Sequence, residues 1–320
     1  MRYHTANWAG AAPSPMVVRM FFLPALPRDL ARLTALLAAA VLLVTGVTTG
    51  GSPAQAREET QARAAASGPR AHFSVATLNL RKGMRVPGMR HDIGRVIGGG
   101  ASLIGFQERL FSRPALRASL PKSWSLLMPD GPTGTDDNPI AFDKDVWKLQ
   151  RTWPVLLTGK TWRRNTGRTA HDQYGVVAVL RHRASDHVIR SVSFHLPNHL
   201  HNRGTGGPNY ANRGGVEAMW RMAHRVRRLE QNAPEGHQLV AMCDCNVTAD
   251  RDTTDLLLKG RIIKPLGLKS NYAVKGRGPG SGIDYVLAEQ GESFRLASYR
   301  SYTDLATDHP GVVASFVRRR

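Results

Sequence analysis

Several apolar segments of this chain end abruptly in polar side chains, and this feature constrains the fold most. The clearest is Leu239-Val-Ala-Met-Cys-Asp-Cys-Asn246, in which four apolar residues lead to Asp244 and Asn246. Residues two apart on a strand point to the same face, so a carboxylate and an amide lie side by side at the strand end. The segment from Ile104 to Glu108 repeats the pattern and ends in a Gln-Glu pair. A purely structural core strand does not carry such groups.

These strand ends carry the groups that a metal-assisted reaction needs. Oxygen ligands in the arrangement of Asp244 and Asn246 suit a hard cation such as Mg²⁺, or a water bound to it. The alternative is that the two residues cap a turn, which is common for any one Asp-Asn pair. Further polar residues follow apolar runs at Asn79, His195 and Asp284, and Asp308-His309 precedes the last run. Each has a simple explanation alone, but together they predict a site.

Short strand patterns alternate with a few helical ones along most of the chain. Helices are predicted at residues 90–97 and 216–230, the second with apolar residues at helical spacing. Strands are predicted at residues 72–80, 103–106, 139–142, 176–180, 188–194, 239–242, 283–288 and 312–316. The strand at 103–106 should return beside the first, and those at 176–180 and 188–194 should form a hairpin. Mixed strands with interspersed helices predict two packed sheets covered by helices.

In this order, the polar residues resemble the motifs of the endonuclease/exonuclease/phosphatase superfamily. Its first-strand Asn matches Asn79, its Gln-Glu motif ends at Glu108, and its strand histidine matches His195. Its Gly-Asp-Phe-Asn motif matches residues 243–246, where Cys replaces both the Gly and the Phe. Its Asp-Tyr strand begins at Asp284, and its terminal Ser-Asp-His motif matches residues 307–309. The similarity spans residues 73–316.

The resemblance implies an α/β (α+β) four-layer sandwich, in which two packed mixed β-sheets are flanked by helices. It implies a metal-dependent phosphodiesterase, with Mg²⁺ as the expected cofactor and Mn²⁺ as the alternative. Metal ligands would be Asn79, Glu108 and Asp308. Catalytic residues would be His195, Asp244, Asn246, Asp284 and His309. The number of metal ions stays open.

Substrate choice in such a fold lies in the loops, and two loops are basic. Aromatic and cationic groups interleaved there favour nucleic acid. Candidate substrate-binding residues are Tyr174, Arg163, Arg164, Arg168, Arg203 and Arg213. A secreted phospholipid or inositol-phosphate hydrolase and a non-catalytic polyanion-binding protein are the alternatives. DNA and RNA, and endo and exo cleavage, are not distinguished. No sign of a protein partner is present, and we expect a monomer.

Composition agrees with a folded, polyanion-binding protein. Apolar residues make up 42% of the chain and charged residues 21%, which excludes wholesale disorder. The formal charge of +20 favours nucleic acid, and anionic lipid is the alternative partner. An Arg-rich genome would also raise the charge.

The first part of the chain reads as an export signal. Arg28 and Arg32 precede an apolar run from Leu33 to Val44, and a small-residue site follows at Ala54-Gln-Ala56. We therefore expect a signal peptide at residues 1–56, a linker at 57–71 and the catalytic domain at 72–320. Met16 and Met20 are the alternative translation starts. An uncleaved membrane anchor with an extracytoplasmic catalytic domain is the alternative to secretion.

The two cysteines flank a single residue. Cys243 and Cys245 are the only cysteines in the sequence. On a regular strand, residues at this spacing point the same way but lie too far apart for easy bridging. We therefore expect both to be small apolar core residues.

Overall fold

Six strands form each of two mixed β-sheets in the computed structural model. The structure describes residues 72–81, 83–108, 113–131, 134–135, 137–159, 161–163, 168–170, 172–198, 200, 213–247, 268–270, 282–289 and 294–318. The predicted leader at 1–56 and the predicted linker at 57–71 lie outside these residues. No helix within the described ranges is long and apolar enough to span a bilayer.

The first sheet has the strand order β13-β14-β1-β2-β4-β3. Strand β1 pairs in parallel with β2 and antiparallel with β14. The strands are β1 (His72–Asn79), β2 (Leu103–Gln107), β3 (Trp124–Leu127), β4 (Ile140–Asp143), β13 (Phe294–Tyr302) and β14 (Gly311–Arg318). The predicted return of the second strand beside the first is confirmed.

The second sheet has the strand order β11-β12-β10-β9-β8-β5. Strands β9 and β10 are parallel, and β8 and β9 form the predicted hairpin. The strands are β5 (Trp147–Thr158), β8 (Gln173–His182), β9 (Val188–His195), β10 (His237–Asp244), β11 (Leu268–Ser270) and β12 (Asp284–Glu289). A small two-stranded ribbon of β6 (Thr161–Arg163) and β7 (Arg168–Ala170) continues from β5 and β8.

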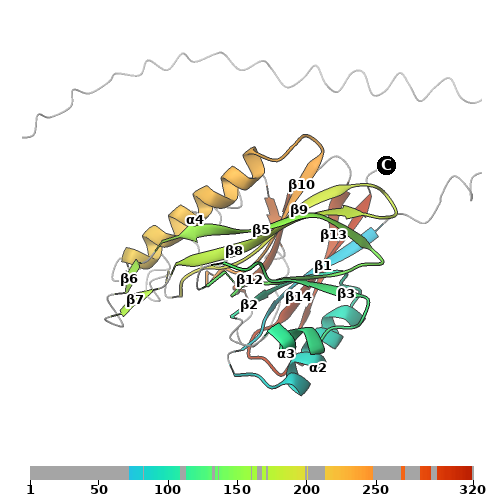
Figure 1. Ribbon diagram of the computed structural model, residues 1–320, viewed down its shortest axis with the longest axis horizontal. Helices are drawn as coiled ribbons and strands as arrows, with labels where there is room; N and C mark the ends of the chain where they lie inside the picture. Colours follow the sequence, from blue (N-terminus) through green and yellow to red (C-terminus); the bar gives the residue numbers. More distant parts are fainter. Residues whose placement is uncertain are drawn as a thin grey trace, which may run out of the picture. The chain divides into compact units, whose positions relative to one another are not determined.

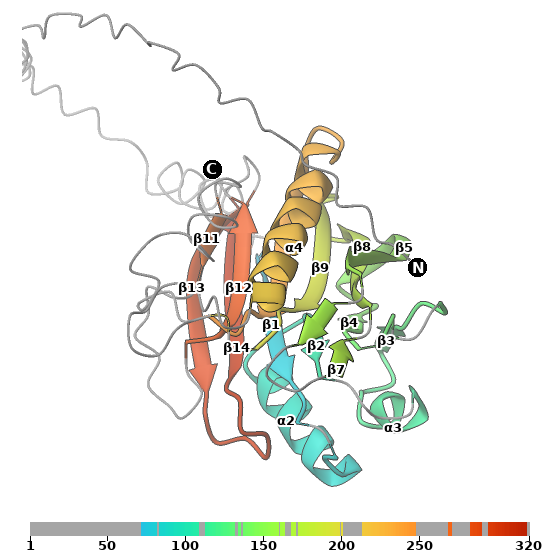
Figure 2. The same cartoon turned by 90° about the vertical axis from the view of Figure 1, so that its left-hand side faces the viewer.

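Helices cover the two outer faces of the paired sheets (Figures 1 and 2). Helices α2 (Val86–Gly98) and α3 (Arg113–Ala118) pack on the sheet of β1 and β2. Helix α4 (Arg213–Gln231) packs on the sheet of β9 and β10. The order is helix, sheet, sheet, helix, which confirms the predicted four-layer sandwich.

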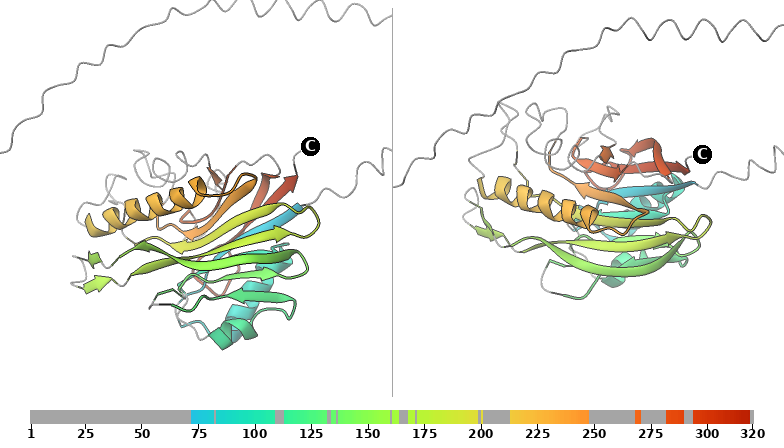
Figure 3. Two further views of the ribbon diagram at one scale, coloured as in Figure 1. Left: turned by 45° about the horizontal axis from the view of Figure 1, so that its top comes forward. Right: turned by 90° about the horizontal axis from the view of Figure 1, so that it is seen from above.

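Helix α4 is amphipathic, and its apolar stripe explains where it lies. Val216, Met219, Ala223 and Val226 recur at helical spacing and are buried against the outer face of β8, β9 and β10. Figure 3 shows the helix running along these strands. The residues between the apolar positions face away from the sheet and are largely charged.

A third apolar layer fills the space between the two sheets. Val75 and Leu103 from one sheet meet Val176 and Met242 from the other. At Gly105 the sheets approach so closely that a Cβ atom would lie 2.7 Å from Cβ of Met242. Only glycine fits there without a shift of the facing strand, because real Cβ contacts are never that short.

Candidate active site

The strand directions bring the predicted polar residues to one edge of the sandwich. The parallel strands β1 and β2 end there, as do β9 and β10. Strands β12 and β14 are antiparallel to their neighbours, so they begin at the same edge. The polar residues at these strand ends are Asn79, Glu108, His195, Asp244, Asp284 and His309.

Asp244 is the centre of this group. It is 1% exposed, and its Oδ2 atom accepts a 2.9 Å hydrogen bond from Nδ2 of Asn79. The same oxygen lies 3.3 Å from Nε2 of His195 and 3.8 Å from Nδ1 of His309. Side chains from three other strand ends or loops thus converge on one carboxylate oxygen.

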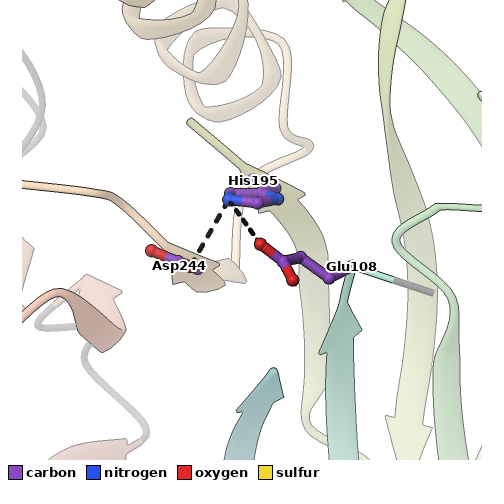
Figure 4. Close-up of side chains that lie close together, drawn as sticks. All are labelled: Glu108, His195 and Asp244. Atoms are coloured by element: carbon purple, nitrogen blue, oxygen red, sulfur yellow. Dashed lines mark ion pairs between the residues drawn. The ribbon is translucent and has the colours of Figure 1, made fainter. Parts of the chain in front are cut away.

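Glu108 stands opposite Asp244, with His195 between them (Figure 4). Its Oε1 atom lies 3.9 Å from Nε2 of His195. The backbone of Glu108 has φ of +56°, a left-handed conformation that is uncommon for a residue with a side chain. This conformation ends strand β2.

Asn246 has a left-handed backbone as well, with φ of +49°. Its backbone N–H donates to Oδ1 of Asp244 at 2.9 Å, and Nδ2 donates to the carbonyl of Leu196 at 2.8 Å. Nδ2 also lies 2.8 Å from Nε2 of His195. Because an amide NH₂ group cannot accept a hydrogen bond, this contact assigns a lone pair to Nε2 of His195.

Three side chains that could bind a cation converge beside this contact. The donor atoms of Glu108, His195 and Asp244 all lie within 4.8 Å of one another. Oδ1 of Asn79, beside Asp244, is buried and has no hydrogen-bond partner among the described residues. Converging carboxylate, imidazole and amide donors fit a divalent cation, and a cation there would relieve the repulsion between the lone pairs.

His309 and Asp284 form a buried pair next to this group. Nδ1 of His309 lies 3.0 Å from Oδ2 and 3.2 Å from Oδ1 of Asp284. Burial lowers the pKa of the His309 imidazole, but its hydrogen bond with Asp284 and the charges of Asp284, Asp244 and Asp308 outweigh burial and raise it to about 9. Burial and the charge of Asp244 raise the pKa of the Asp284 carboxyl to about 7.

The pKa values of Asp284 and His309 are linked, because the two side chains share one proton. We assign this proton to His309. When the proton is on His309, the imidazolium and the Asp284 carboxylate form a hydrogen-bonded ion pair, and the charge of each buried group is compensated. When the proton is on Asp284, both partners are neutral, and the charge of the nearby Asp244 is left without a cation.

The loop before His309 is fixed from below by Asp92 of α2. Asp92 is fully buried, and its carboxylate accepts hydrogen bonds from the backbone N–H groups of Ala306 at 2.7 Å and Thr307 at 2.9 Å. The Thr307 hydroxyl in turn donates to the carbonyl of Asn79 at 2.9 Å. Asp92 was not among the predicted residues, because nothing in the local sequence marks it.

Gln107 joins the two sheets beneath the site. It is fully buried and accepts a 3.0 Å hydrogen bond from the hydroxyl of Thr77. Its amide nitrogen donates to Oγ of Ser193 at 3.2 Å, and Ser193 donates to the carbonyl of Phe106. Its role in the structure is to hold β1, β2 and β9 together.

A cavity of about 390 Å³ opens above these groups. It is lined by Glu108, Asp137, Gln173, His195, Leu196, Pro197, Asn198, Asp244, Asn246 and His309. Sequence reasoning missed Asp137, Gln173 and Asn198. Oδ1 of Asn138, next to Asp137, and Oε1 of Gln173 are buried and have no hydrogen-bond partner within the described residues. Gln173 could not be predicted from the sequence, because it reaches this edge only through the pairing of β8 with its neighbouring strands.

The other predicted site residues fall at different distances from this cavity. Asp308 is exposed and acts on His309 through its charge. Tyr174 is partly buried, and its carbonyl accepts a 2.7 Å hydrogen bond from Asn138. Arg163 and Arg168 face each other in the β6–β7 ribbon, and Arg213 begins α4. The side chains of these three arginines, and all of Arg164 and Arg203, lie outside the described residues.

The expectation for the two cysteines was wrong. Cys243 and Cys245 form a disulfide with Cα atoms 5.3 Å apart. A flat strand would separate these atoms by roughly 6.8 Å. The strand ends at Asp244 and the chain turns toward Asn246, which shortens the distance into the range that disulfides span.

Comparison with known proteins identifies the fold. No protein-family model and no curated protein matches the sequence. An endonuclease/exonuclease/phosphatase family protein from Bacteroides thetaiotaomicron matches with a TM-score of 0.60 and 14% identity. The match covers 79% of this chain and 100% of that protein's chain. The mannosyl-6-phosphatase of Bacteroides thetaiotaomicron VPI-5482 matches with a TM-score of 0.55 and 13% identity over 77% of this chain and 99% of its own. TDP2 of D. rerio, complexed with a single-strand DNA product, matches with a TM-score of 0.52 and 11% identity over 77% and 99%. The chain has the fold of the endonuclease/exonuclease/phosphatase proteins.

Proposed function

We propose that the protein is an exported, divalent-metal-dependent phosphodiesterase that acts on nucleic acid. The observation that carries the proposal is the convergence of Glu108, His195 and Asp244 at the floor of a polar cavity. A cation at this point would neutralise phosphate charge and lower the barrier to attack by water. Mg²⁺ suits the carboxylate and amide oxygens, and Mn²⁺ also accepts the imidazole nitrogen.

The residues of the chain divide the remaining work. Glu108, Asp244 and the free carbonyl of Asn79 would hold the cation, with Asp308 as a further proposed ligand. His195 would join them when its contact with the Asn246 amide opens. The Asn246 amide would help to orient the attacking water, and the Asp244 carboxylate would accept its proton. As water adds to phosphorus, the bond to the leaving oxygen breaks, and that oxygen takes up a proton from solvent.

His309 would stabilise the negative charge that develops on the phosphate. Its Nδ1 atom faces Asp284, so Nε2 is the nitrogen that remains for an oxygen of a substrate in the cavity. The raised pKa keeps the ring cationic at neutral pH. An imidazolium held in place in a buried site stabilises the transition state more than an imidazolium that moves freely in water, because less reorganisation is needed.

The surface charge favours nucleic acid over lipid. The outward face of α4 carries exposed His224, Arg225, Arg227 and Arg228, and Arg221 is 57% exposed beside Glu217. Such a face suits a phosphate backbone. Within the described residues, Leu156 is the one exposed large apolar side chain, whereas membrane-inserting enzymes present several.

Two features support export. The basic segment, apolar run and small-residue site before residue 57 fit a signal peptide. The Cys243–Cys245 disulfide fits an oxidising compartment, because cytosolic thiols are kept reduced.

One panel of assays tests the proposal. The protein is incubated with plasmid DNA, RNA, sphingomyelin vesicles and a sugar phosphate, each with Mg²⁺ and with EDTA. We expect cleavage of nucleic acid that EDTA abolishes. If the protein releases phosphate only from the sugar phosphate, it is a phosphatase and not a nuclease. If it hydrolyses only sphingomyelin, it is a phospholipid phosphodiesterase.

The role of α4 is tested with paired arginines. Arg225→Ala with Arg228→Ala should raise KM for long DNA at low salt and leave hydrolysis of bis(p-nitrophenyl) phosphate unchanged. Arg181→Ala with Arg183→Ala, which remove the same charge from the β8–β9 hairpin, should change neither. Equal effects of the two pairs would show that only net charge matters.

A further inference from the structure

The Cys243–Cys245 disulfide spans one residue, and that residue is Asp244. Both cysteines are fully buried. Along β10, Leu239, Ala241 and Cys243 face the core beneath α4, and Cys245 belongs to the same core. Asp244 lines the cavity instead. The disulfide therefore joins the two neighbours of Asp244 within the core beneath α4, whereas Asp244 itself lines the cavity.

The same link shapes the turn that follows. Cα atoms of the two cysteines are 5.3 Å apart, against roughly 6.8 Å in a flat strand. This shortening accompanies the left-handed backbone of Asn246 and the 2.9 Å hydrogen bond from its N–H to Oδ1 of Asp244. Asn adopts this left-handed conformation more readily than other residues with a side chain, so it suits the turn.

Hydrogen bonds also hold this turn, including those from the Asn246 amide to the Leu196 carbonyl and from the Tyr285 hydroxyl to the Val247 carbonyl. The backbone N–H of Cys245 donates to the carbonyl of Ile283 at 2.7 Å, and that of Leu196 donates to the carbonyl of Asp244 at 2.9 Å. Residues 248–267 lie outside the described part of the chain. The covalent link is thus the strongest described constraint on the position of Asn246 relative to Asp244.

We propose that the Cys243–Cys245 disulfide is a positioning device for Asp244 and Asn246, and that breaking it lowers turnover without unfolding the domain. The inference rests on the proposed function of these two residues. A disulfide that closes so short a loop removes little entropy from the unfolded chain, so its effect on global stability is small. Its effect on a carboxylate that must be placed within a fraction of an ångström is large.

Breaking the bond chemically needs a dithiol such as dithiothreitol. The dithiol supplies two electrons and two protons, the S–S bond is replaced by two S–H groups, and the reagent becomes a cyclic disulfide. Because both sulfurs are buried, reduction requires local opening and long incubation. Alkylation under denaturing conditions followed by mass spectrometry then counts the free thiols.

The test compares the oxidised protein, the dithiol-treated protein and the double variant Cys243→Ala, Cys245→Ala. We expect no free thiol in the untreated protein, a loss of kcat of about 10²-fold after reduction or in the double variant, and a nearly unchanged KM. Reoxidation should restore kcat in the wild type, and dithiol should not affect the double variant. Melting temperatures should differ by only a few degrees.

A second measurement does not depend on activity. Hydrogen exchange at the Asn246 amide should become faster when the disulfide is broken, while exchange in the core of β10 stays slow. Two free thiols in the untreated protein, or unchanged exchange and unchanged kcat after reduction, would overturn the proposal. A parallel loss of kcat and melting temperature would assign the link to general stability. Altered exchange without any hydrolysis by the oxidised protein would refute the proposed function and retain the positioning role.

Discussion

Asn79 donates a hydrogen bond from Nδ2 to Oδ2 of Asp244, 2.9 Å away, and so joins the two sheets at the floor of the cavity. Asn79 ends β1 of one sheet and Asp244 ends β10 of the other. Both side chains are almost completely buried. The relative position of the two sheets thus sets the position of the carboxylate that we propose to be catalytic.

Replacing Asn79 should therefore damage both metal binding and turnover. Asn79→Ala removes the donor to Asp244 and the free carbonyl beside it, and we expect turnover to fall by about 10²-fold or more. Asn138→Ala is the matched control, because Asn138 is equally buried and also has one bonded and one free amide atom. Calorimetric titration with Mn²⁺ should show weaker binding for Asn79→Ala alone. Equal losses in both variants would mean that burial, not the site, explains the effect.

Asp92 should matter for turnover although it lies outside the cavity. Asp92→Asn replaces one acceptor oxygen by an NH₂ group, so one of the N–H groups of Ala306 and Thr307 loses its partner. We expect kcat to fall by roughly 10- to 100-fold, because the loop continues into Asp308 and His309. Asp304→Asn is the control, since Asp304 links the same loop to α2 through an exposed ion pair with Arg95. Its kcat should stay within about two-fold of the wild type, and a larger loss than in Asp92→Asn would contradict this account.

His309 and Asp284 should behave as a unit. His309→Ala and Asp284→Asn should each lower turnover by about 10²- to 10⁴-fold, because each removes the oriented cation. The double variant should be little worse than His309→Ala alone. Multiplicative losses in a double-mutant cycle would show that the two residues act independently. Melting temperatures of the same preparations separate loss of function from loss of fold.

The opposite end of the sandwich should make stability depend on pH. His182 and His187 are buried there, and burial lowers the pKa of both imidazoles, and that of His237, below the usual 6.5. The folded protein holds these rings neutral, whereas the unfolded chain takes up protons as the pH falls through 6.5. Their contribution to stability is therefore present above pH 6.5 and is lost as the pH falls below it.

Melting temperatures between pH 7.5 and 5 check this sign. The wild type should lose several degrees over this range. His187→Gln, which keeps a polar group near Gln238, should show a weaker dependence. An identical slope for the two proteins would exclude His187 as a contributor.

Much of the site could be predicted because its residues end apolar strands. Asp244 and Asn246 share one short segment, and Glu108 ends another, so local sequence was sufficient to find them. Asp92 could not be found in this way, because its partners are backbone groups more than two hundred residues away. Backbone N–H groups leave no signature in a sequence.

The strands that were missed lie at sheet edges. Strand β5 contains Lys148, Arg151 and Pro154 and is half-exposed, so no regular apolar alternation marks it. Proline is tolerated there because an edge strand has one side without ladder hydrogen bonds. Strand β13 has a register shift between Leu296 and Ser298 that interrupts its alternation. The disulfide was missed for a related reason, since a regular strand was assumed where the chain turns.

The central claim is that Glu108 helps to bind a divalent cation that phosphodiester hydrolysis requires. The most direct measurement is Mn²⁺ affinity by calorimetry together with Mg²⁺-dependent hydrolysis of bis(p-nitrophenyl) phosphate, for Glu108→Gln and for Glu217→Gln. The two side chains are similarly exposed, at 37% and 42%, but Glu217 lies on α4 beside Arg221. Glu108→Gln should weaken metal binding and lower turnover by at least about 10-fold each, with an unchanged melting temperature in EDTA. Glu217→Gln should resemble the wild type, and equal metal affinity and turnover in Glu108→Gln would contradict the account.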